Sequence, residues 1–508
     1  MKTNFSFSKK PHTSLLLATA TLLLVSMQSA IFADSGTWNS SGSTDWNTNG
    51  NWSPTTGSPG TTASDTATFD NLSSVTSLFV SATLANDIAA ITFTNSETHS
   101  FTITANPFHS LTLSGTGITN SSGITQNFVT AVDGSGNSGG LIFRNSATAG
   151  SMTSFTNSGA IVSGFTGGLT AFFNTSTADS ATITNNGGTV SGAGGGFTEF
   201  VDSSTAGSAT LIANGGTVAG AGGGSIRFFN ASDGGTASVD VRNNGAGTAG
   251  FLEISLHTGG VTIGSLEGSG NVFLGANNLT IGSNNLSKTF SGVIQDGGFS
   301  GGTGGSLTKT GTGALTLTGA NTYTGGTTVN DGSLFVNNPG GLSGTGTGAV
   351  TVNGGTLGGG NGTAIASIIS GAVTVNTGAT LAPGPTGDGS TGILHTGALT
   401  LNSGSTFSVD LEGPLAGTDY DQVFVTGAVS IMDANLALNL VSGLSVNDHL
   451  FIVESTGAVT GTFAGLDDGT TFTQDGVTFT IDYYPSGALG GNVELTVDRV
   501  APVPEPTT

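Results

Sequence analysis

Residues 169–174 read Leu-Thr-Ala-Phe-Phe-Asn, residues 197–202 read Phe-Thr-Glu-Phe-Val-Asp, and residues 225–230 read Ser-Ile-Arg-Phe-Phe-Asn. These stretches are 28 residues apart, and each has a Phe at its fourth position and an Asn or Asp at its sixth. A further copy lies 29 residues upstream, so the recurring positions are Phe143, Phe172, Phe200 and Phe228, with Asn145, Asn174, Asp202 and Asn230. A pattern that recurs at a fixed period of this length indicates a solenoid.

Each period between about residues 140 and 243 contains three short apolar pieces, separated by Asn, Gly and Ser turns. In one period we expect these to be Leu169–Phe173, Ala181–Thr184 and Thr189–Val190. A strand of three to five residues buries only one or two side chains, because successive side chains point to opposite faces. One period therefore cannot form a core, but periods stacked about 4.8 Å apart can. The other recurring positions are Ala149, Ala178 and Ala206, then Ile161, Val190 and Val218, and Asn157, Asn186 and Asn214.

Stacking predicts that Phe lies on Phe inside, and that Asn lies on Asn at corners, where its amide can bond the coils above and below. Gly and Asn suit these corners because they adopt positive φ readily. We therefore predict an all-β protein, a right-handed parallel β-helix (β-solenoid) with a terminal β cap. The cap is expected from strands at 436–440, 449–453, 477–481 and 493–497. The alternative is a β-sandwich of regularly spaced hairpins, which would not need the same residue type every 28 positions.

A second pattern occupies residues 313 to about 434. Five copies of one alternating strand begin at Gly313, Gly348, Gly371, Gly397 and Gly427, with spacings of 35, 23, 26 and 30 residues. Apolar and hydroxyl residues alternate in each copy, which predicts one buried and one solvated face. The unequal spacings predict loops of different length between strands that recur.

The stretch from Leu307 to Val329, Leu-Thr-Lys-Thr-Gly-Thr-Gly-Ala-Leu-Thr-Leu-Thr-Gly-Ala-Asn-Thr-Tyr-Thr-Gly-Gly-Thr-Thr-Val, resembles the autotransporter-associated β-strand repeat. Residues 380–384 and 417–422 are similar to segments that follow this repeat in such proteins, as are the N-terminal Trp38, Trp46 and Trp52 with residues 65–69. The resemblance implies a secreted or surface-displayed bacterial β-helix.

Both ends of the chain contain stretches that resemble sorting signals. Three Lys precede an apolar stretch at 15–25 and a small residue at Ala33, which is typical of a secretory signal peptide, or alternatively of an N-terminal membrane anchor. Residues 503–506, Val-Pro-Glu-Pro, resemble the start of a PEP-CTERM sorting signal. The predicted organisation is a signal peptide over 1–33, an N-terminal cap with the first coils over 34–135, a β-helix with 28–29-residue repeats over 136–300, a β-helix with autotransporter-associated strand repeats over 301–434, a C-terminal β cap over 435–500 and a Pro-rich tail over 501–508.

Composition excludes several classes of function. The 508 residues include 86 Gly and no Cys, so disulfides and thiolate chemistry are absent. A net charge of −22 argues against nucleic acid as a partner, because binding it requires a basic surface. Beyond the predicted signal peptide no segment approaches the roughly 18 apolar residues of a membrane helix, so no stable transmembrane segment is expected.

We nominate no catalytic, cofactor-binding or metal-binding residue, and no enzyme activity is expected. The histidines beyond the signal peptide are isolated: His99, His109, His257, His395 and His449. Residues 134–140 match glycine-rich motifs around Ser138, but no helical pattern surrounds them and we predict a turn. The paired acids Asp467 and Asp468, and Asp419 and Asp421, also suit turns, with calcium binding left open. The three tryptophans are expected to plug the first coil, the alternative being a platform for stacking carbohydrate.

The predicted function is therefore that of a secreted or surface-displayed structural β-helix, matrix-like or adhesin-like, with extracellular polysaccharide or cell-surface components as possible partners. A glycan-binding adhesin would show aromatic residues in a solvent-facing groove. A polysaccharide-degrading β-helix enzyme would bring acids and a base within about 5 Å on one face. Only six basic residues remain for that purpose after the signal peptide, and we expect Arg144 to align with Phe173 and Arg227 with Glu199.

Overall fold

The computed structural model describes residues 34–81, 86–338, 341–360, 367–386, 389–440, 443–487 and 490–501, all within one compact unit, Ala33–Thr508. The predicted signal peptide and nearly all of the predicted tail lie outside the described residues. Among those described, the one helical element is a single 3-10 turn, η1 (Asn49–Asn51), and no helix could cross a membrane. The remaining elements are strands in four sheets.

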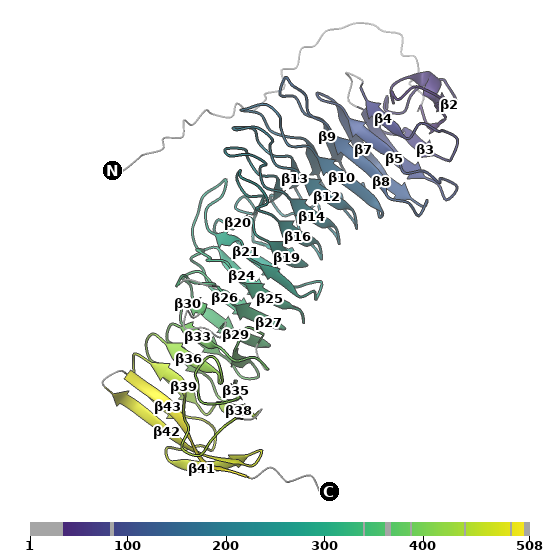
Figure 1. The fold of residues 1–508 in the computed structure, drawn as a ribbon. Helices are drawn as coiled ribbons and strands as arrows, with labels where there is room; N and C mark the ends of the chain where they lie inside the picture. The colour runs from purple at the N-terminus through teal and green to yellow at the C-terminus, as the bar shows by residue number, and fades with distance from the viewer. Residues whose placement is uncertain are drawn as a thin grey trace, which may run out of the picture. The chain divides into compact units, whose positions relative to one another are not determined.

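The first sheet has 12 strands and covers the N-terminal half (Figure 1). All its neighbours are parallel except the first pair, β2 and β1. Its strands in order are β2 (Trp52–Ser53), β1 (Gly36–Trp38), β3 (Thr66–Phe69), β5 (Asn86–Phe93), β7 (Ser110–Asn120), β9 (Gly140–Phe143), β11 (Leu169–Phe172), β13 (Phe197–Phe200), β15 (Ser225–Phe228), β17 (Phe251–Glu253), β20 (Asn271–Phe273) and β23 (Val293–Gln295).

The second sheet has 15 parallel strands, one from each coil, and so gives the solenoid about 15 turns. Its strands are β4 (Ser77–Val80), β6 (Thr102–Ala105), β8 (Gln126–Thr130), β10 (Thr153–Asn157), β12 (Thr182–Asn185), β14 (Thr210–Ala213), β16 (Ser238–Val241), β19 (Ser265–Gly268), β22 (Lys288–Phe290), β25 (Ala314–Leu317), β27 (Ser333–Val336), β29 (Thr356–Gly359), β32 (Thr380–Pro383), β35 (Thr406–Leu411) and β38 (Asn435–Leu440).

A third, nine-stranded sheet begins near residue 261 and is wholly parallel. Its strands are β18 (Val261–Ile263), β21 (Asn278–Ile281), β24 (Ser306–Lys309), β26 (Thr327–Val329), β28 (Val350–Val352), β31 (Val373–Val375), β34 (Leu399–Leu401), β37 (Val429–Met432) and β40 (Val459–Thr462).

The fourth sheet has seven strands and closes the C-terminal end. Its first four strands continue the parallel stacking, and its last three are antiparallel. The strands in order are β30 (Ser367–Ile369), β33 (Ile393–Thr396), β36 (Gln422–Val425), β39 (His449–Ser455), β43 (Gly490–Val500), β42 (Val477–Gly487) and β41 (Thr470–Gln474). The predicted all-β solenoid with a terminal β cap is thereby confirmed. The strand expected in the cap at 436–440 instead ends the 15-stranded sheet as β38.

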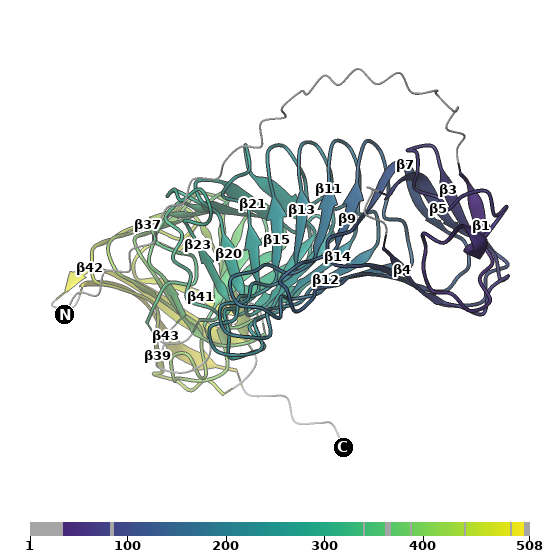
Figure 2. The ribbon, with the colours of Figure 1, turned by 90° about the horizontal axis from the view of Figure 1, so that it is seen from above.

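The phenylalanine column forms as predicted. Phe143, Phe172, Phe200 and Phe228 are fully buried, and their ring centroids lie 4.7, 4.9 and 4.8 Å apart in near-parallel stacks. Figure 2 shows their strands, β9, β11, β13 and β15, side by side. The predicted corners are also confirmed, because the recurring Asn and Asp residues have positive φ at Asn145, Asn174, Asp202 and Asn230.

Two details of the repeat were predicted wrongly. Asn157 pairs with Asn185 and not with Asn186, and the buried Asn157 amide donates to the Asn185 Oδ1 atom at 2.7 Å. The expected third apolar piece is no strand at all: its Val190 is 38% exposed, as are its counterparts Ile161 and Val218 at 43% and 39%. These residues lie on glycine-rich loops that reach beyond the core.

The coil changes its cross-section along the chain. Each 28-residue coil contributes two strands to the sheets. At a third place, successive coils are joined only by isolated β-bridges, through Thr148, Thr177, Thr205 and Asp233. From Val261 onward, each coil has a third strand, which belongs to the nine-stranded sheet. Four of the five copies of the second pattern stack in this sheet, but the copy at 313–317 lies in the 15-stranded sheet as β25.

Candidate functional site

A column of hydroxyl groups runs along the outer face of the nine-stranded sheet. In eight of its nine strands an outward-facing residue lies between two buried residues, and in β40 it lies between the buried Val459 and the exposed Gly461. The strand pairing places these nine outward residues in register. We name this set the hydroxyl column; it consists of Thr262, Thr280, Thr308, Thr328, Thr351, Thr374, Thr400, Ser430 and Thr460. Adjacent members are about 4.8 Å apart, which is the spacing between paired strands.

Small and amide side chains flank the hydroxyl column. Alanines stand two positions before it, at Ala349, Ala372, Ala398, Ala428 and Ala458, all exposed. Asparagines stand two positions after it, and each amide donates to the preceding Oδ1: Asn353 to Asn330 at 3.0 Å, Asn376 to Asn353 at 2.8 Å and Asn402 to Asn376 at 2.7 Å. A hydroxyl both donates and accepts a hydrogen bond. This face therefore offers uncharged, evenly spaced hydrogen-bonding groups.

Charged side chains gather in a groove of about 560 Å³ on the outer face of the 15-stranded sheet. Asp240 and Glu267 occupy successive positions of one column. The Arg242 Nε atom lies 2.7 Å from the Asp240 carboxylate, and the Lys288 Nζ atom lies 2.8 Å from that of Glu267. The sequence contains the signal for this cluster, two outward acids 27 residues apart, but we did not single it out.

This groove has the acids and bases that a polysaccharide-degrading enzyme would need. A general acid, however, requires a carboxyl that is kept protonated, commonly by an apolar pocket. Both carboxylates here are paired with a cation instead. The arrangement suits hydrogen bonding to a bound molecule better than proton transfer.

The alignments predicted for two other bases are confirmed. Arg144 lies over the Phe173 ring at 5.3 Å, and Arg227 pairs in register with Glu199, its NH1 atom 3.0 Å from a carboxylate oxygen. Arg227 also lies 4.1 and 5.1 Å from the ring centroids of Phe197 and Phe299, and burial lowers its pKa. These interactions hold a guanidinium between aromatic rings on β15, within the 12-stranded sheet.

Aromatic residues do not form an exposed platform at the N-terminus. The predicted plug is what the structure shows: Trp38, Trp46 and Trp52 are 0–1% exposed and pack edge to face at 4.8–5.1 Å. Each indole N–H donates to a backbone carbonyl. Elsewhere, the exposed aromatic side chains include Phe299 at 54% and Phe108 at 78%.

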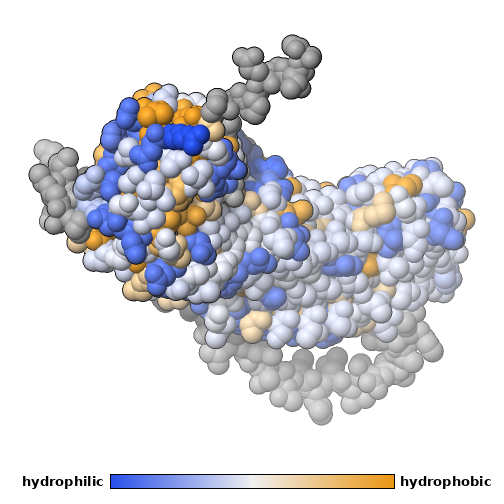
Figure 3. All heavy atoms as spheres, turned by 90° about the horizontal axis from the view of Figure 1, so that it is seen from below, coloured by the Kyte–Doolittle hydropathy of each residue, from blue (hydrophilic) through white to orange (hydrophobic). Residues whose placement is uncertain are grey.

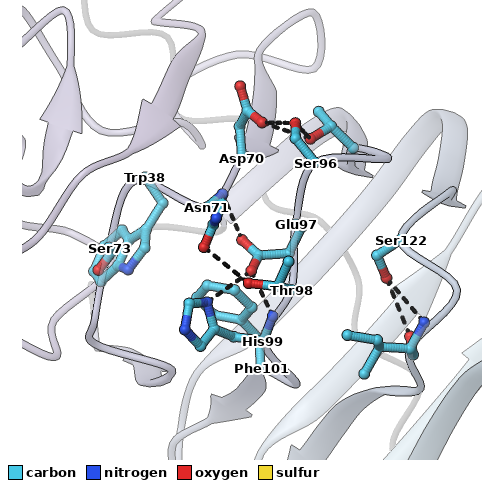
Figure 4. A network of polar contacts seen from close by, with 12 residues as sticks. Trp38, Asp70, Asn71, Ser73, Ser96, Glu97, Thr98, His99, Phe101 and Ser122 are labelled. Carbon is cyan, nitrogen blue, oxygen red and sulfur yellow. Dashed lines mark hydrogen bonds and ion pairs between the residues drawn. The ribbon is translucent and has the colours of Figure 1, made fainter.

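Corner residues next to this plug illustrate the role of the isolated histidines (Figure 4). The buried Glu97 carboxylate accepts hydrogen bonds from the Asn71 N–H, the His99 N–H and the His99 ring, at 2.8, 2.7 and 3.0 Å. Nearby, hydrogen bonds from Ser96 and Thr94 lower the pKa of Asp70. These contacts tie one corner to the next, so His99 is a structural residue.

The other motifs weighed above also have structural roles. Residues 134–140 form a turn in which the Asp133 carboxylate accepts from the backbone of Ser135 and Asn137. Asp419 lies in a turn, whereas Asp421 is buried and accepts from the Gly392 and Asp410 N–H groups, so the turn predicted at Asp421 is wrong. Within the described part of the chain, no group of three His, Cys, Asp or Glu could hold a metal ion.

Three buried polar side chains shape the coil between β24 and β27. The Lys309 Nζ atom donates to the carbonyls of Thr310, Gly311 and Asp331 at 2.6, 2.7 and 3.2 Å, and burial lowers its pKa to about 8. Asn321 accepts from the Ile294 N–H and donates to the Gly344 carbonyl, which joins the coils on either side. The Tyr323 hydroxyl bonds Thr327 at 2.6 Å, and burial raises its pKa.

The fold and these surfaces define the class of protein: a parallel β-solenoid with repetitive outer faces. Within it, residues 307–335 match the family model of the passenger-associated transport repeat, which covers β24 to β27 and the three buried polar residues. This match supports the resemblance to an autotransporter-related repeat. A comparison of the chain with curated proteins found no match.

Proposed function

We propose that the protein is a secreted or surface-displayed structural solenoid, without catalytic activity, that adheres to neutral extracellular polysaccharide. The hydroxyl column carries the proposal. Nine hydroxyls at a constant spacing can each make a weak hydrogen bond, and many weak contacts along one polymer add up through multivalency. The surface drawn in Figure 3 is largely of intermediate hydropathy, with strongly hydrophilic and hydrophobic residues scattered over it.

Charge favours a neutral partner. The chain has a net charge of −22, so nucleic acid and strongly anionic glycans would be repelled. The hydroxyl column contains no charged side chain in any of its nine positions. A neutral polysaccharide brings hydroxyls that can donate to and accept from threonine hydroxyls.

The test is co-sedimentation with insoluble neutral polysaccharides, such as cellulose and β-1,3-glucan. The triple variant Thr351→Glu, Thr374→Glu and Thr400→Glu places three charges on the hydroxyl column and should reduce the bound fraction at least fivefold. The matched control changes Thr356, Thr380 and Thr406, outward threonines of the 15-stranded sheet, to Glu. It adds the same charge on another face and should leave binding within twofold. Equal binding by both variants would contradict the proposal.

Export is tested separately. We propose that residues 1–33 are removed during secretion, as the basic, apolar and small-residue segments of that stretch suggest. Mass spectrometry of protein recovered outside the cytoplasm should give a mature chain beginning at Asp34. A full-length chain that stays with the cytoplasmic fraction would contradict secretion.

A further inference from the structure

The 15-stranded sheet parts between β19 and β22. These two strands pair only at Gly268 and Phe290, whereas β16 and β19 share four register pairs and β22 and β25 share three. This weak pairing lies where the coil gains its third strand. The new strand, β18, ends only one residue, Gly264, before β19 begins. Gly268 has φ +101°, and a Cβ there would lie 2.1 Å from the Val241 carbonyl oxygen, so this bend requires glycine.

The charged groove described above lies over this parting. Its walls carry the two ion pairs, Arg242 with Asp240 and Lys288 with Glu267, and its remaining lining is small or hydroxylated: Gly268, Ser287, Thr289, Ala314 and Thr316. Its volume falls within the roughly 300–1,000 Å³ typical of ligand sites. The groove is therefore a polar site of the right size for a short segment of polymer.

The placement of charge is unusual for this protein. Two of the six basic residues that follow the predicted signal peptide stand in this one groove. Asp240 and Glu267 are neighbours in the sheet, and like charges at such positions repel each other. The two cations remove that repulsion and fix both carboxylates in place.

The ion pairs leave hydrogen-bonding capacity unused. A guanidinium has five N–H donors and an ammonium has three, and each carboxylate can accept about four hydrogen bonds. The two carboxylates would repel an anionic ligand, and Arg242 and Lys288 would repel a cationic ligand. A neutral ligand with neighbouring hydroxyls can donate to the acids and accept from the bases at the same time.

We propose that this groove binds a segment of a neutral oligosaccharide, through hydrogen bonds from its hydroxyls to the two ion pairs. The inference rests on the proposed function, since it supplies a defined subsite for the same class of polymer. The hydroxyl column provides many weak contacts, and the groove provides a few strong ones because hydrogen bonds to charged groups contribute about 1.5–3 kcal/mol each.

Isothermal titration calorimetry of the full mature chain tests the inference with soluble cellohexaose, laminarihexaose and xylohexaose, and with hexagalacturonate as an anionic probe. At least one neutral hexasaccharide should bind, and hexagalacturonate should bind at least tenfold more weakly. The double variant Glu267→Gln/Lys288→Gln removes one ion pair without changing the net charge. It should weaken binding at least tenfold, with an unchanged circular dichroism spectrum.

The matched control is Glu199→Gln/Arg227→Gln, which removes an ion pair on the 12-stranded sheet and should leave affinity within twofold. The inference is overturned if no neutral hexasaccharide binds, if hexagalacturonate binds more tightly, or if both double variants behave alike. Co-sedimentation with insoluble polysaccharide that persists while soluble hexasaccharides fail to bind would reject the groove alone. Loss of both would reject the proposed function as well.

Discussion

The coils from β9 to β16 and those from β24 to β37 achieve the same stacking with different side chains. The first set has phenylalanine rings inside, stacked nearly parallel with centroids 4.7–4.9 Å apart. The second set has branched aliphatic residues, such as Val350, Val373 and Leu399, in register. The first set keeps a period of 28–29 residues, whereas paired residues of the nine-stranded sheet in the second set are 20 to 30 residues apart.

The difference indicates how tightly a core side chain constrains the loops. Near-parallel aromatic rings are most favourable at one particular offset and separation, so a change in loop length that shifts one strand would disrupt the stack. Aliphatic side chains pack in more than one relative position, and their volume matters more than their orientation. The C-terminal coils can therefore accept loops of different length while their strands remain in register.

Replacing a stacked phenylalanine should have the largest effect on the free energy of unfolding. Phe200→Ala removes a fully buried ring that stacks on both Phe172 and Phe228, and should lower the free energy of unfolding by about 3–5 kcal/mol. Val375→Ala, in the aliphatic column, should cost about 2 kcal/mol. Urea unfolding followed by circular dichroism measures both, and the exposed Phe108→Ala serves as the control. Equal costs for Phe200→Ala and Val375→Ala would remove the distinction between the two cores.

Lys309 anchors the C-terminal coils through a buried cation, whereas buried asparagines such as Asn157 and Asn185 connect the N-terminal coils. Lys309→Met leaves three carbonyls without their donor and should cost about 1–3 kcal/mol at pH 7. The half-exposed Lys288→Met should cost less than 1 kcal/mol. Similar costs for the two lysines would show that the buried amine is not an anchor.

The same lysine predicts a pH dependence. Burial lowers its pKa from about 10.5 to about 8, so between these values the unfolded chain binds more protons than the folded one. The contribution of Lys309 to the free energy of unfolding should therefore rise as the pH increases from 8 to 10.5. Unfolding of wild type and Lys309→Met at pH 7.5 and 10 should show a difference that widens at the higher pH. A constant difference would contradict the lowered pKa.

Asparagine ladders occur in both regions, but at different depths. Asn185 is fully buried and bonds Asn157, Thr198 and the Ile212 carbonyl, so Asn185→Ala should cost about 1–3 kcal/mol. Asn376, in the ladder beside the hydroxyl column, is half-exposed, and Asn376→Ala should cost about 0.5–1 kcal/mol. Thermal unfolding of the two variants compares them directly. A larger loss at Asn376 would mean that ladder length outweighs burial.

The smallest effect is expected on the glycine-rich loops of the N-terminal coils. Val190 recurs with the period of the core but is 38% exposed, so Val190→Ser should change stability by less than about 0.5 kcal/mol. The buried Ile183→Ser in the same coil is the comparison and should be severely destabilising. A loss above 1 kcal/mol for Val190→Ser would show that these loops pack in solution as the repeat suggested.

Periodicity predicted some parts of the molecule and misled at others. The spacing of Phe172 and Phe200 predicted the phenylalanine column, because identical residues at a fixed period can meet only by stacking. The same argument failed for Val190, since a residue can recur in a loop that repeats without being buried. It also predicted the partner of Asn157 one position too late, because two adjacent asparagines, Asn185 and Asn186, fit the period nearly equally well.

The sequence by itself determined that this chain stacks short strands into a β-solenoid, because no single period contains enough apolar residues for a core of its own. Outside that core the regular 28-residue period also predicted that Arg227 lies beside Glu199, but where the period is irregular only the tertiary structure decided which residues meet. The hydroxyl column and the charged groove are built from residues 18–30 positions apart, on strands whose order depends on loop lengths. Alternation with period two indicates which side chains point outward. Which outward side chains lie next to one another depends on how many strands each coil contains, and that number changes near residue 261.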